Sequence, residues 1–182
     1  MKVIGIVGMP GSGKGEFSAV SAELGIPVVV MGDVIREEVK KEGLPPVDTS
    51  MGVVARRLRE QYGMAAIAHV CIPVIESQKT PVVLIDGIRG DAEVREFADH
   101  FQDFILIAID SPLETRFDRL KVRGRSDDLN DISELSARDE RESSFGLRQA
   151  MNLATMRVQN TGTLAEYRKT VRSTLEQIAG VS

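Results

Sequence analysis

The sequence predicts an α/β fold with three layers, in which helices cover both faces of a five-stranded parallel sheet. Short apolar runs rich in β-branched residues alternate with segments of helical pattern along the chain. Such alternation is typical of parallel sheets joined by crossover helices. A glycine-rich stretch directly follows the first apolar run, at the edge of the sheet where ligands bind in such folds.

The order of the elements follows from the apolar runs. Two segments interrupt the alternation: residues 33–78 contain several helical patterns in succession, and residues 122–131 are polar and charged. We expect both to lie above the carboxyl edge of the sheet, in positions suited to moving lids. The whole chain, 1–182, is expected to form one domain. The predicted strands are Lys2–Val7, Pro27–Met31, Val82–Asp86, Phe104–Asp110 and Thr155–Gln159.

The composition bounds the class of protein. The hydrophobic content of 42% fits a soluble globular domain, and the net charge of −4 argues against a general nucleic-acid binder. Cys71 is the single cysteine and lies in an apolar run, so we expect a buried thiol and no internal disulfide. No signal peptide or membrane span is visible, which favours a cytoplasmic protein. The amphipathic segment Val53–Tyr62 fits either a core or a partner, which leaves the oligomeric state open.

The glycine-rich stretch carries the strongest functional signal. Gly8, Gly13 and Lys14 have the spacing of a phosphate-binding P-loop. Glycines let backbone N–H groups converge at a helix N-terminus, where the helix dipole also favours an anion. We expect Lys14 to contact the terminal phosphates of ATP. The residues expected to bind ATP in this turn are Gly8, Met9, Pro10, Gly11, Ser12, Gly13, Lys14, Gly15 and Glu16.

The residue after Lys14 determines how a metal ion would be held. Gly15 stands where Ser or Thr usually offers a hydroxyl to Mg²⁺. We therefore expect a metal held through water by another carboxylate, and Asp86 ends an apolar strand beside the P-loop. The alternative role for Asp86 is the N-cap of the next helix. Asp91 suits that role better, because it directly precedes the helical pattern.

Arginines occur on three further segments that the fold would bring near the P-loop. Arg36 lies one turn into a helix that we expect Asp33 to cap, and Arg89 follows the third strand. For Arg36, an ion pair with a nearby Glu on a solvated face is the plainer interpretation. The third segment runs from Arg116 to Asp128 and is followed by Arg138. Planar guanidinium donors suit the charge of a phosphoryl group in transfer.

Two other interpretations apply to the third segment. An RNA-binding patch would need interleaved aromatic residues, and Phe117 is the only one nearby. Salt bridges along a surface helix account for some of the arginines. Nucleic acid is therefore not the partner that the sequence favours.

Together, these stretches resemble the nucleoside monophosphate kinases, of which adenylate kinase is the best known. The stretch Gly8–Gly15 resembles the P-loop of that family, and Gly32–Arg36 resembles its acceptor-binding helix. Asp86–Arg89 is similar to its Asp-Gly-aromatic-Pro-Arg segment, shortened by one residue. Gly124–Asp128 resembles its short lid, whereas Asn160–Leu164 is more similar to dephospho-coenzyme A kinase. The combination resembles an archaeal family of kinase-like P-loop proteins.

The resemblance implies an ATP-dependent kinase that uses Mg²⁺ and a phosphate-accepting small molecule. It implies that residues 33–78 bind the acceptor and that residues 122–131 form the lid. Glu16 and Glu93 depart from the pattern, since adenylate kinases place Thr and an adenine-reading Gln there. The residues with expected roles are Lys14, Asp86, Arg125 and Arg138 in catalysis, Arg123 at the nucleotide, and Asp33, Arg36 and Arg89 at the acceptor.

Two alternatives to a small-molecule kinase stay open. One is an ATPase or nucleotide-dependent switch that acts on a macromolecular partner, and the other is a non-catalytic nucleotide-binding module. Arginines on separate segments favour the kinase, because a switch needs no acceptor site. The departures at Glu16 and Glu93 keep the ATPase open, because a carboxylate near the phosphates would repel them.

Overall fold

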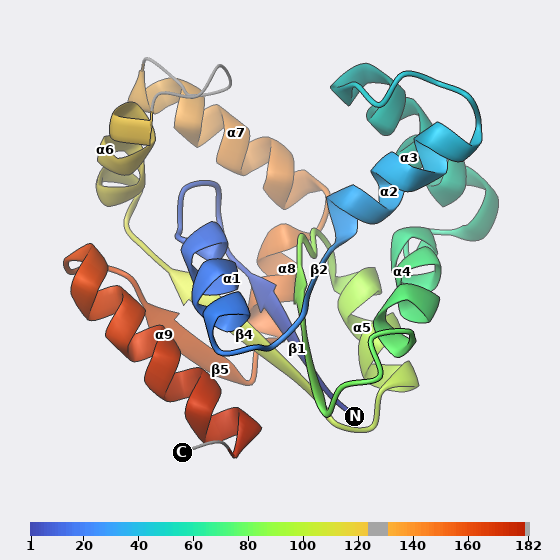
Figure 1. The fold of residues 1–182 in the computed structure, drawn as a ribbon. Helices are drawn as coiled ribbons and strands as arrows, with labels where there is room; N and C mark the ends of the chain where they lie inside the picture. The colour runs from blue at the N-terminus through green and yellow to red at the C-terminus, as the bar shows by residue number, and fades with distance from the viewer. Residues whose placement is uncertain (124–130, 181–182) are drawn as a thin grey trace.

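A five-stranded parallel sheet lies at the centre of the computed structural model, which describes residues 1–123 and 131–180 (Figure 1). The strand order is β2-β3-β1-β4-β5, and every pair of neighbours is parallel. This arrangement confirms the predicted fold class. The strands are β1 (Lys2–Val7), β2 (Val28–Val30), β3 (Val82–Asp86), β4 (Phe104–Asp110) and β5 (Met156–Gln159).

Three of the predicted strands have the predicted bounds, and two are shorter. Strand β2 ends at Val30 because the next residue, Met31, already begins a helix. Pro27 lies outside β2, but its carbonyl still accepts a hydrogen bond from the N–H of Leu84 at 2.9 Å. Likewise, Thr155 precedes β5, and its N–H donates to the carbonyl of Leu106 at 3.0 Å.

Helices cover both faces of the sheet, and each face has its own apolar core. On one face, Ile4 and Ile107 of the sheet pack in a cluster with Phe17 and Val171 from α1 and α9. On the other face, helices α4, α5 and α8 contribute to a second cluster. The helices are α1 (Lys14–Glu23), α2 (Met31–Lys41), α3 (Asp48–Tyr62), α4 (Ala66–Glu76), α5 (Asp91–His100), α6 (Leu113–Arg123), α7 (Ile132–Ser144), α8 (Leu147–Asn152) and α9 (Leu164–Ala179).

The carboxyl edge of the sheet is flanked by two groups of helices. In Figure 1, α2 and α3 stand on one side of this edge, and α6 and α7 on the other, with the β1–α1 turn between them. The predicted insertion, residues 33–78, contains most of α2 together with α3 and α4. The predicted lid, residues 122–131, lies almost wholly outside the described residues. The groups that could act on a ligand therefore gather at one edge.

Two expectations about single features can be compared with the structure. Cys71 is buried within α4, as expected, and burial raises the pKa of its thiol to about 12. None of the helices in the described part of the chain is long and apolar enough to cross a membrane.

Candidate functional site

The turn between β1 and α1 contains two glycines in a backbone conformation that disfavours other residues. Gly11 and Gly13 have φ angles of 76° and 111°, in the left-handed region that disfavours side chains. A Cβ atom on Gly13 would come within 2.4 Å of the Asn160 Nδ2 atom. The turn therefore depends on glycine for both its conformation and its packing.

The same turn leaves several hydrogen-bond donors unused. Within residues 1–123 and 131–180, no hydrogen bond uses the N–H of Gly11, Gly13, Lys14 or Gly15. The hydroxyl of Ser12, which is buried, also has no partner among the described residues. Unused N–H groups at the start of a helix form a binding site for phosphate oxygens. The turn thus fits the phosphate groups of a nucleotide.

Side chains from distant parts of the chain clamp this turn from outside. The Asn160 Nδ2 atom donates to the carbonyl of Ser12 at 2.8 Å, and the hydroxyl of Tyr167 donates to the carbonyl of Gly13 at 3.2 Å. Arg116 Nη1 donates to the carbonyl of Pro10 at 2.9 Å. Three backbone carbonyls of the P-loop are therefore held by the β5–α9 region and by α6.

Part of the arginine-rich segment is structural. Arg116 is buried and bonds to both carboxylate oxygens of Asp139 in α7, at 2.9 and 2.5 Å. Arg119 donates through Nη2 to the carbonyl and to the Oδ1 atom of Asn160, at 3.0 and 2.9 Å. Both guanidinium groups are therefore engaged in holding the P-loop and its clamp, and the Arg116–Asp139 ion pair is buried, unlike the salt bridges expected along a surface helix.

Lys14, the first residue of α1, folds its side chain back over the β1–α1 turn. Its ammonium donates to the carbonyls of Gly8 at 2.6 Å and Met9 at 3.3 Å. Burial lowers the pKa of Lys14 from 10.5 to about 8, against the influence of the carboxylates of Asp86 and Glu142. The guanidinium groups of Arg89 and Arg138 lower this pKa further. Charged groups from β3, the β3–α5 turn and α7 therefore act together on one ammonium group.

Asp86 lies beside the P-loop with a partner that sequence analysis did not identify. Its Oδ2 atom accepts a hydrogen bond of 2.9 Å from the hydroxyl of Ser18. Ser18 lies one helical turn after Lys14, on the same side of α1, and that spacing was the only signal in the sequence.

The donors near Asp86 fit a magnesium ion held mainly by a nucleotide. No group of three or more His, Cys, Asp or Glu side chains that could hold a metal occurs in the described part of the chain. Mg²⁺ commonly binds one carboxylate together with substrate phosphates and water. Asp86 could supply that carboxylate. A Cβ atom on Gly15 would meet nothing within 4 Å. Lack of room is therefore not the reason why this position has Gly in place of the usual Ser or Thr.

Glu16 points toward α9 in an ion-pair network. Its carboxylate pairs with the guanidinium of Arg168, which also pairs with Glu23 at 2.6 Å. A neighbouring cation thus offsets the negative charge that Glu16 brings near the turn.

A cleft of about 880 Å³ lies between the α2–α4 helices and the β3–α5 turn. Met31 and Ile35 of α2, Met51 of α3 and Ile67 of α4 form apolar parts of its lining. Phe145, at the end of α7, lines its outer part and is 57% exposed. The charged residues of the lining are Arg56, Arg59, Glu60, Arg89, Asp91 and Glu93.

The carboxylate of Glu93 is buried and hydrogen-bonded within the protein. Its side chain is only 2% exposed. The Oε2 atom accepts a 2.8 Å hydrogen bond from the N–H of Arg89, and the Oε1 atom lies 3.3 Å from Arg59 Nη2. Burial raises the pKa of Glu93, whereas these two partners lower it. The carboxylate is thus occupied by the protein, where adenylate kinases have a Gln that reads the acceptor base.

Asp33 and Arg36 lie away from this cleft. The N-cap of α2 is Val30 and not Asp33, because the helix begins at Met31 directly after β2; the predicted cap was wrong. Arg36 forms an ion pair with Asp33 on an exposed face, and neither residue lines the cleft. Arg36 therefore makes an ion pair on a solvated face, as the plainer interpretation expected, but its partner is Asp33 and not a Glu.

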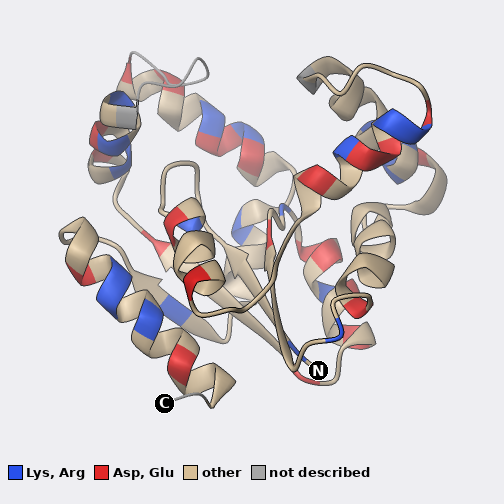
Figure 2. Cartoon of the chain, in the orientation of Figure 1, with Lys and Arg blue, Asp and Glu red and all other residues tan. Residues whose placement is uncertain are grey.

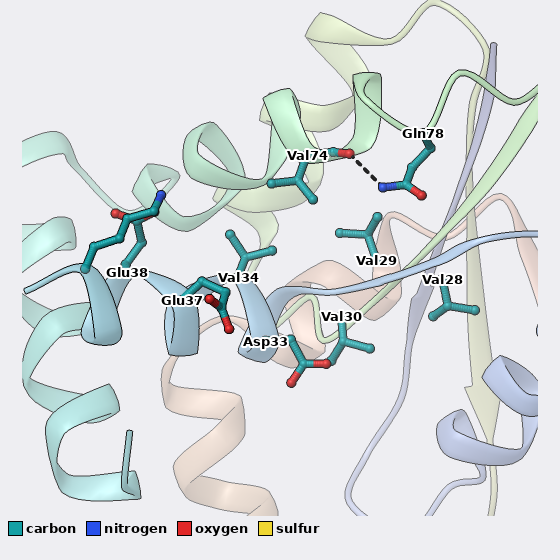
Figure 3. A pocket seen from close by; sticks show the side chains of 10 residues that line it. Val28, Val29, Val30, Asp33, Val34, Glu37, Glu38, Val74 and Gln78 are labelled. Carbon is teal, nitrogen blue, oxygen red and sulfur yellow. Dashed lines mark hydrogen bonds and ion pairs between the residues drawn. The ribbon is translucent and has the colours of Figure 1, made fainter. Parts of the chain in front are cut away.

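Asp33 instead borders a smaller hollow beside the edge strand β2. This hollow has a volume of about 250 Å³, and valines of β2 and α4 line it (Figure 3). Its acidic residues are paired within α2, Glu37 with Lys40 at 2.6 Å and Glu38 with Lys41 at 2.7 Å. The hollow offers no unbalanced charge to a ligand.

The remaining predicted arginines belong to α6, α7 and the segment between these two helices. Arg138 belongs to α7, Arg123 is the last residue of α6, and Arg125 lies outside the described residues. Figure 2 shows basic and acidic residues interspersed along α7 and α9. Of the arginines predicted at the phosphates, Arg89 and Arg138 are the two that the structure brings into electrostatic contact with Lys14.

Comparison with known proteins places the chain in a family. A family described as an AAA domain matches residues 7–136. A UPF0200 protein of Methanoculleus marisnigri is 57% identical over 180 residues, which cover 99% of this chain and 98% of that protein. A UPF0200 protein of Methanosarcina mazei is 50% identical over 176 residues, covering 96% and 94% of the two chains.

Solved structures share the fold at low sequence identity. The protein TT1252 of Thermus thermophilus has a TM-score of 0.65 and 20% identity, with 97% of each chain covered. Shikimate kinase of Aquifex aeolicus has a TM-score of 0.55 and 20% identity, with 99% of each chain covered. A gluconokinase of Sinorhizobium meliloti has a TM-score of 0.55 and 17% identity, covering 98% of this chain and 94% of that one. The predicted resemblance is confirmed: the chain belongs to the archaeal UPF0200 family, and its fold is that of the P-loop kinases.

Proposed function

We propose that this protein is an ATP-dependent phosphotransferase, which transfers the γ-phosphoryl group of ATP to a small molecule bound in the cleft beside α3. One observation carries the proposal. Arg89 both lines the cleft and acts electrostatically on Lys14 of the P-loop. One guanidinium group therefore lines a cavity of about 880 Å³ that could hold an acceptor and also influences the lysine that is expected at the donor phosphates.

Donor binding follows from the unused hydrogen-bond donors of the turn. The N–H groups of Gly11, Gly13, Lys14 and Gly15 would hold the phosphate oxygens. The ammonium of Lys14 would exchange the carbonyls of Gly8 and Met9 for the β- and γ-phosphates, which are stronger acceptors because they are charged. A bound Mg²⁺ would neutralise phosphate charge, and Asp86 would orient its water.

Transfer itself needs positioning and charge stabilisation and no protein nucleophile. Arg89 and Arg138 would stabilise the phosphoryl group in transfer, together with Arg123 and Arg125 of the arginine-rich segment. The acceptor would be a nucleotide or a nucleotide-like small molecule. Arg36, which pairs with Asp33 outside the cleft, would contribute less to acceptor binding than Arg89.

The test is an acceptor screen. The protein is incubated with ATP and Mg²⁺ and offered nucleoside monophosphates, dephospho-coenzyme A, shikimate or gluconate, the last two being suggested by the names of the structural neighbours. ADP release is measured against a blank without acceptor. Saturable stimulation by one compound, with a phosphorylated product, supports the proposal. Equal ADP release without any acceptor contradicts it and favours an ATPase that acts on a macromolecular partner.

A further inference from the structure

We infer that Arg59, positioned by the buried carboxylate of Glu93, binds an anionic group of the acceptor, so that the acceptor is a small molecule carrying a phosphate or a carboxylate. This inference rests on the proposed function and adds the chemistry that the cleft selects. Arg59 belongs to no motif in the sequence, and Glu93 stood out there only as a departure from the adenylate kinase pattern.

The position of Arg59 follows from the face that α3 presents to the cleft. Met51, Ala55 and Arg59 recur at intervals of four residues and all line the cleft. Residues spaced in this way lie on one side of a helix. Arg57, on another side of α3, pairs instead with Glu42 and does not line the cleft. Arg59 therefore lies at the cleft because of its spacing along α3. Arg57 lies on the same helix but outside the cleft, so it offers a matched control.

The buried carboxylate of Glu93 holds two cleft segments together. Its Oε2 atom accepts from the N–H of Arg89 at 2.8 Å, and its Oε1 atom lies 3.3 Å from Arg59 Nη2. A single side chain thus fixes the β3–α5 turn and the guanidinium of α3. A buried ion pair is seldom more stabilising than apolar residues of the same size. What this pair does supply is a cation that is held in place before a ligand arrives, and such preorganisation favours binding.

Most of the donors of Arg59 are left for a ligand. A guanidinium has five N–H donors, and in the described part of the chain the Glu93 contact is the one hydrogen bond found for Arg59. Its side chain is 24% exposed, so the group is neither fully hydrated nor enclosed. In such partly buried surroundings a charge-assisted hydrogen bond is stronger than at the open surface.

The charges of the lining favour an anion. Asp91 pairs with Arg95, which lies outside the lining, at 3.2 Å. With Asp91 set aside, the charged residues of the lining are three arginines and two glutamates: Arg56, Arg59, Arg89, Glu60 and Glu93. The apolar side chains of Met31, Ile35 and Ile67 would contact the uncharged part of the same molecule. An acceptor with one oxyanion and an apolar or ring-shaped body matches both parts of the cleft.

The experiment measures binding and does not require turnover. The P-loop is first saturated with a non-hydrolysable ATP analogue and Mg²⁺, so that added anions cannot bind there. Pairs of compounds that differ only in the anion are then titrated by calorimetry: AMP and adenosine, CMP and cytidine, and shikimate and its methyl ester. We expect the anionic member of at least one pair to bind about tenfold or more tightly than its uncharged counterpart. The nucleotide and shikimate pairs distinguish a phosphate from a carboxylate.

The variants assign this preference to Arg59. In Arg59→Ala the preference for the anion should fall by about tenfold or more, whereas Arg57→Ala should leave it unchanged. Glu93→Gln keeps the shape but loses the charge that holds Arg59. It should raise the KM for the acceptor several-fold with little change in kcat, and Arg59→Lys should restore part of the preference that Arg59→Ala loses. Thermal unfolding of each variant shows whether it is folded.

The outcomes separate this inference from the proposed function. An Arg59-dependent anion preference without phosphoryl transfer would support the inference and contradict the kinase. Phosphoryl transfer that Arg59→Ala leaves unchanged would support the kinase and overturn the inference. The inference is also overturned if no anionic compound binds the wild-type protein more tightly than its uncharged counterpart, or if folded Arg59→Ala keeps the full preference.

Discussion

The P-loop turn and the cleft beside α3 lie at the same edge of the sheet, but they are built in different ways. The turn is held by Asn160, Tyr167 and Arg116, which reach it from distant segments and bond to its carbonyls. Residues of α2, α3, α4 and the β3–α5 turn line the cleft, and Phe145 at its outer part is largely exposed. A site for a constant group such as a triphosphate benefits from rigidity. A site that closes over a second substrate needs parts that can move.

The largest effect should come from breaking the buried ion pair behind the turn. Asp139→Ala leaves the guanidinium of Arg116 buried beside the Pro10 carbonyl without its counter-ion. The expected loss is about 3–5 kcal/mol in the free energy of unfolding, measured by urea denaturation. Asp33→Ala, which removes an exposed pair on the surface of α2, should cost at most about 1 kcal/mol. Equal losses for the two variants would remove the contrast between a clamped turn and a loosely held flank.

Removing the ammonium of the turn should be the next largest effect. Lys14→Ala should lower the turnover number at least about a hundredfold, because a major charge-stabilising donor is lost. Steady-state ADP release with the identified acceptor measures this. Lys40→Ala, whose lysine pairs with Glu37 on an exposed face, serves as the control and should keep the wild-type rate. Near-normal turnover in Lys14→Ala would refute the assignment of Lys14 to the phosphates.

Two glycines of the same turn should respond in opposite directions. Gly13→Ala forces a Cβ atom against Asn160 at a φ of 111°, and should cost about 1–3 kcal/mol in the free energy of unfolding. Gly15→Ala enters open space in the first turn of α1 and should stabilise the protein by about 0.5–1 kcal/mol. Thermal and urea unfolding of both variants test this pair. Similar stabilities would mean that the clamp does not restrict the turn.

The last effect concerns the pH dependence of the turn. Because burial lowers the pKa of Lys14 to about 8, the folded protein releases a proton that the unfolded chain keeps up to a pH of about 10.5. The unfolded state binds more protons in this window, so this lysine makes the stability rise as the pH increases from about 8 to 10.5. ATP favours the charged ammonium, and its binding above pH 8 should therefore take up a proton. Calorimetry in buffers of different ionisation enthalpy measures the uptake, and Lys14→Met should abolish it.

The fold and the donor half of the site were the parts that the sequence could predict. Strands β1, β3 and β4 were predicted with their observed bounds, because buried parallel strands read as uninterrupted apolar runs. The P-loop was recognisable because its function depends on residues that are neighbours in sequence. In the P-loop, the residues that bind phosphate are adjacent in the sequence, so a local pattern is enough to identify the site.

The parts that could not be predicted depend on contacts between distant residues. The pairing of Arg116 with Asp139 and that of Arg59 with Glu93 join separate helices, and no local pattern signals them. The N-cap at Asp33 was wrong because β2 passes directly into α2 without a capping side chain. Arg36 matched a family motif, but its nearest carboxylate was three residues away on its own helix.

The hydrogen bond between Tyr167 and the Gly13 carbonyl gives the protein an intrinsic optical reporter. The chain contains no tryptophan and two tyrosines, so excitation at wavelengths beyond the absorption of its phenylalanines reaches only those two rings. Tyr62 is 65% exposed on α3, whereas Tyr167 is buried against the turn. Any ligand that shifts Gly13 would change the emission of Tyr167, and Tyr62→Phe would isolate that signal. Nucleotide arrival could thus be followed in real time without attaching a dye.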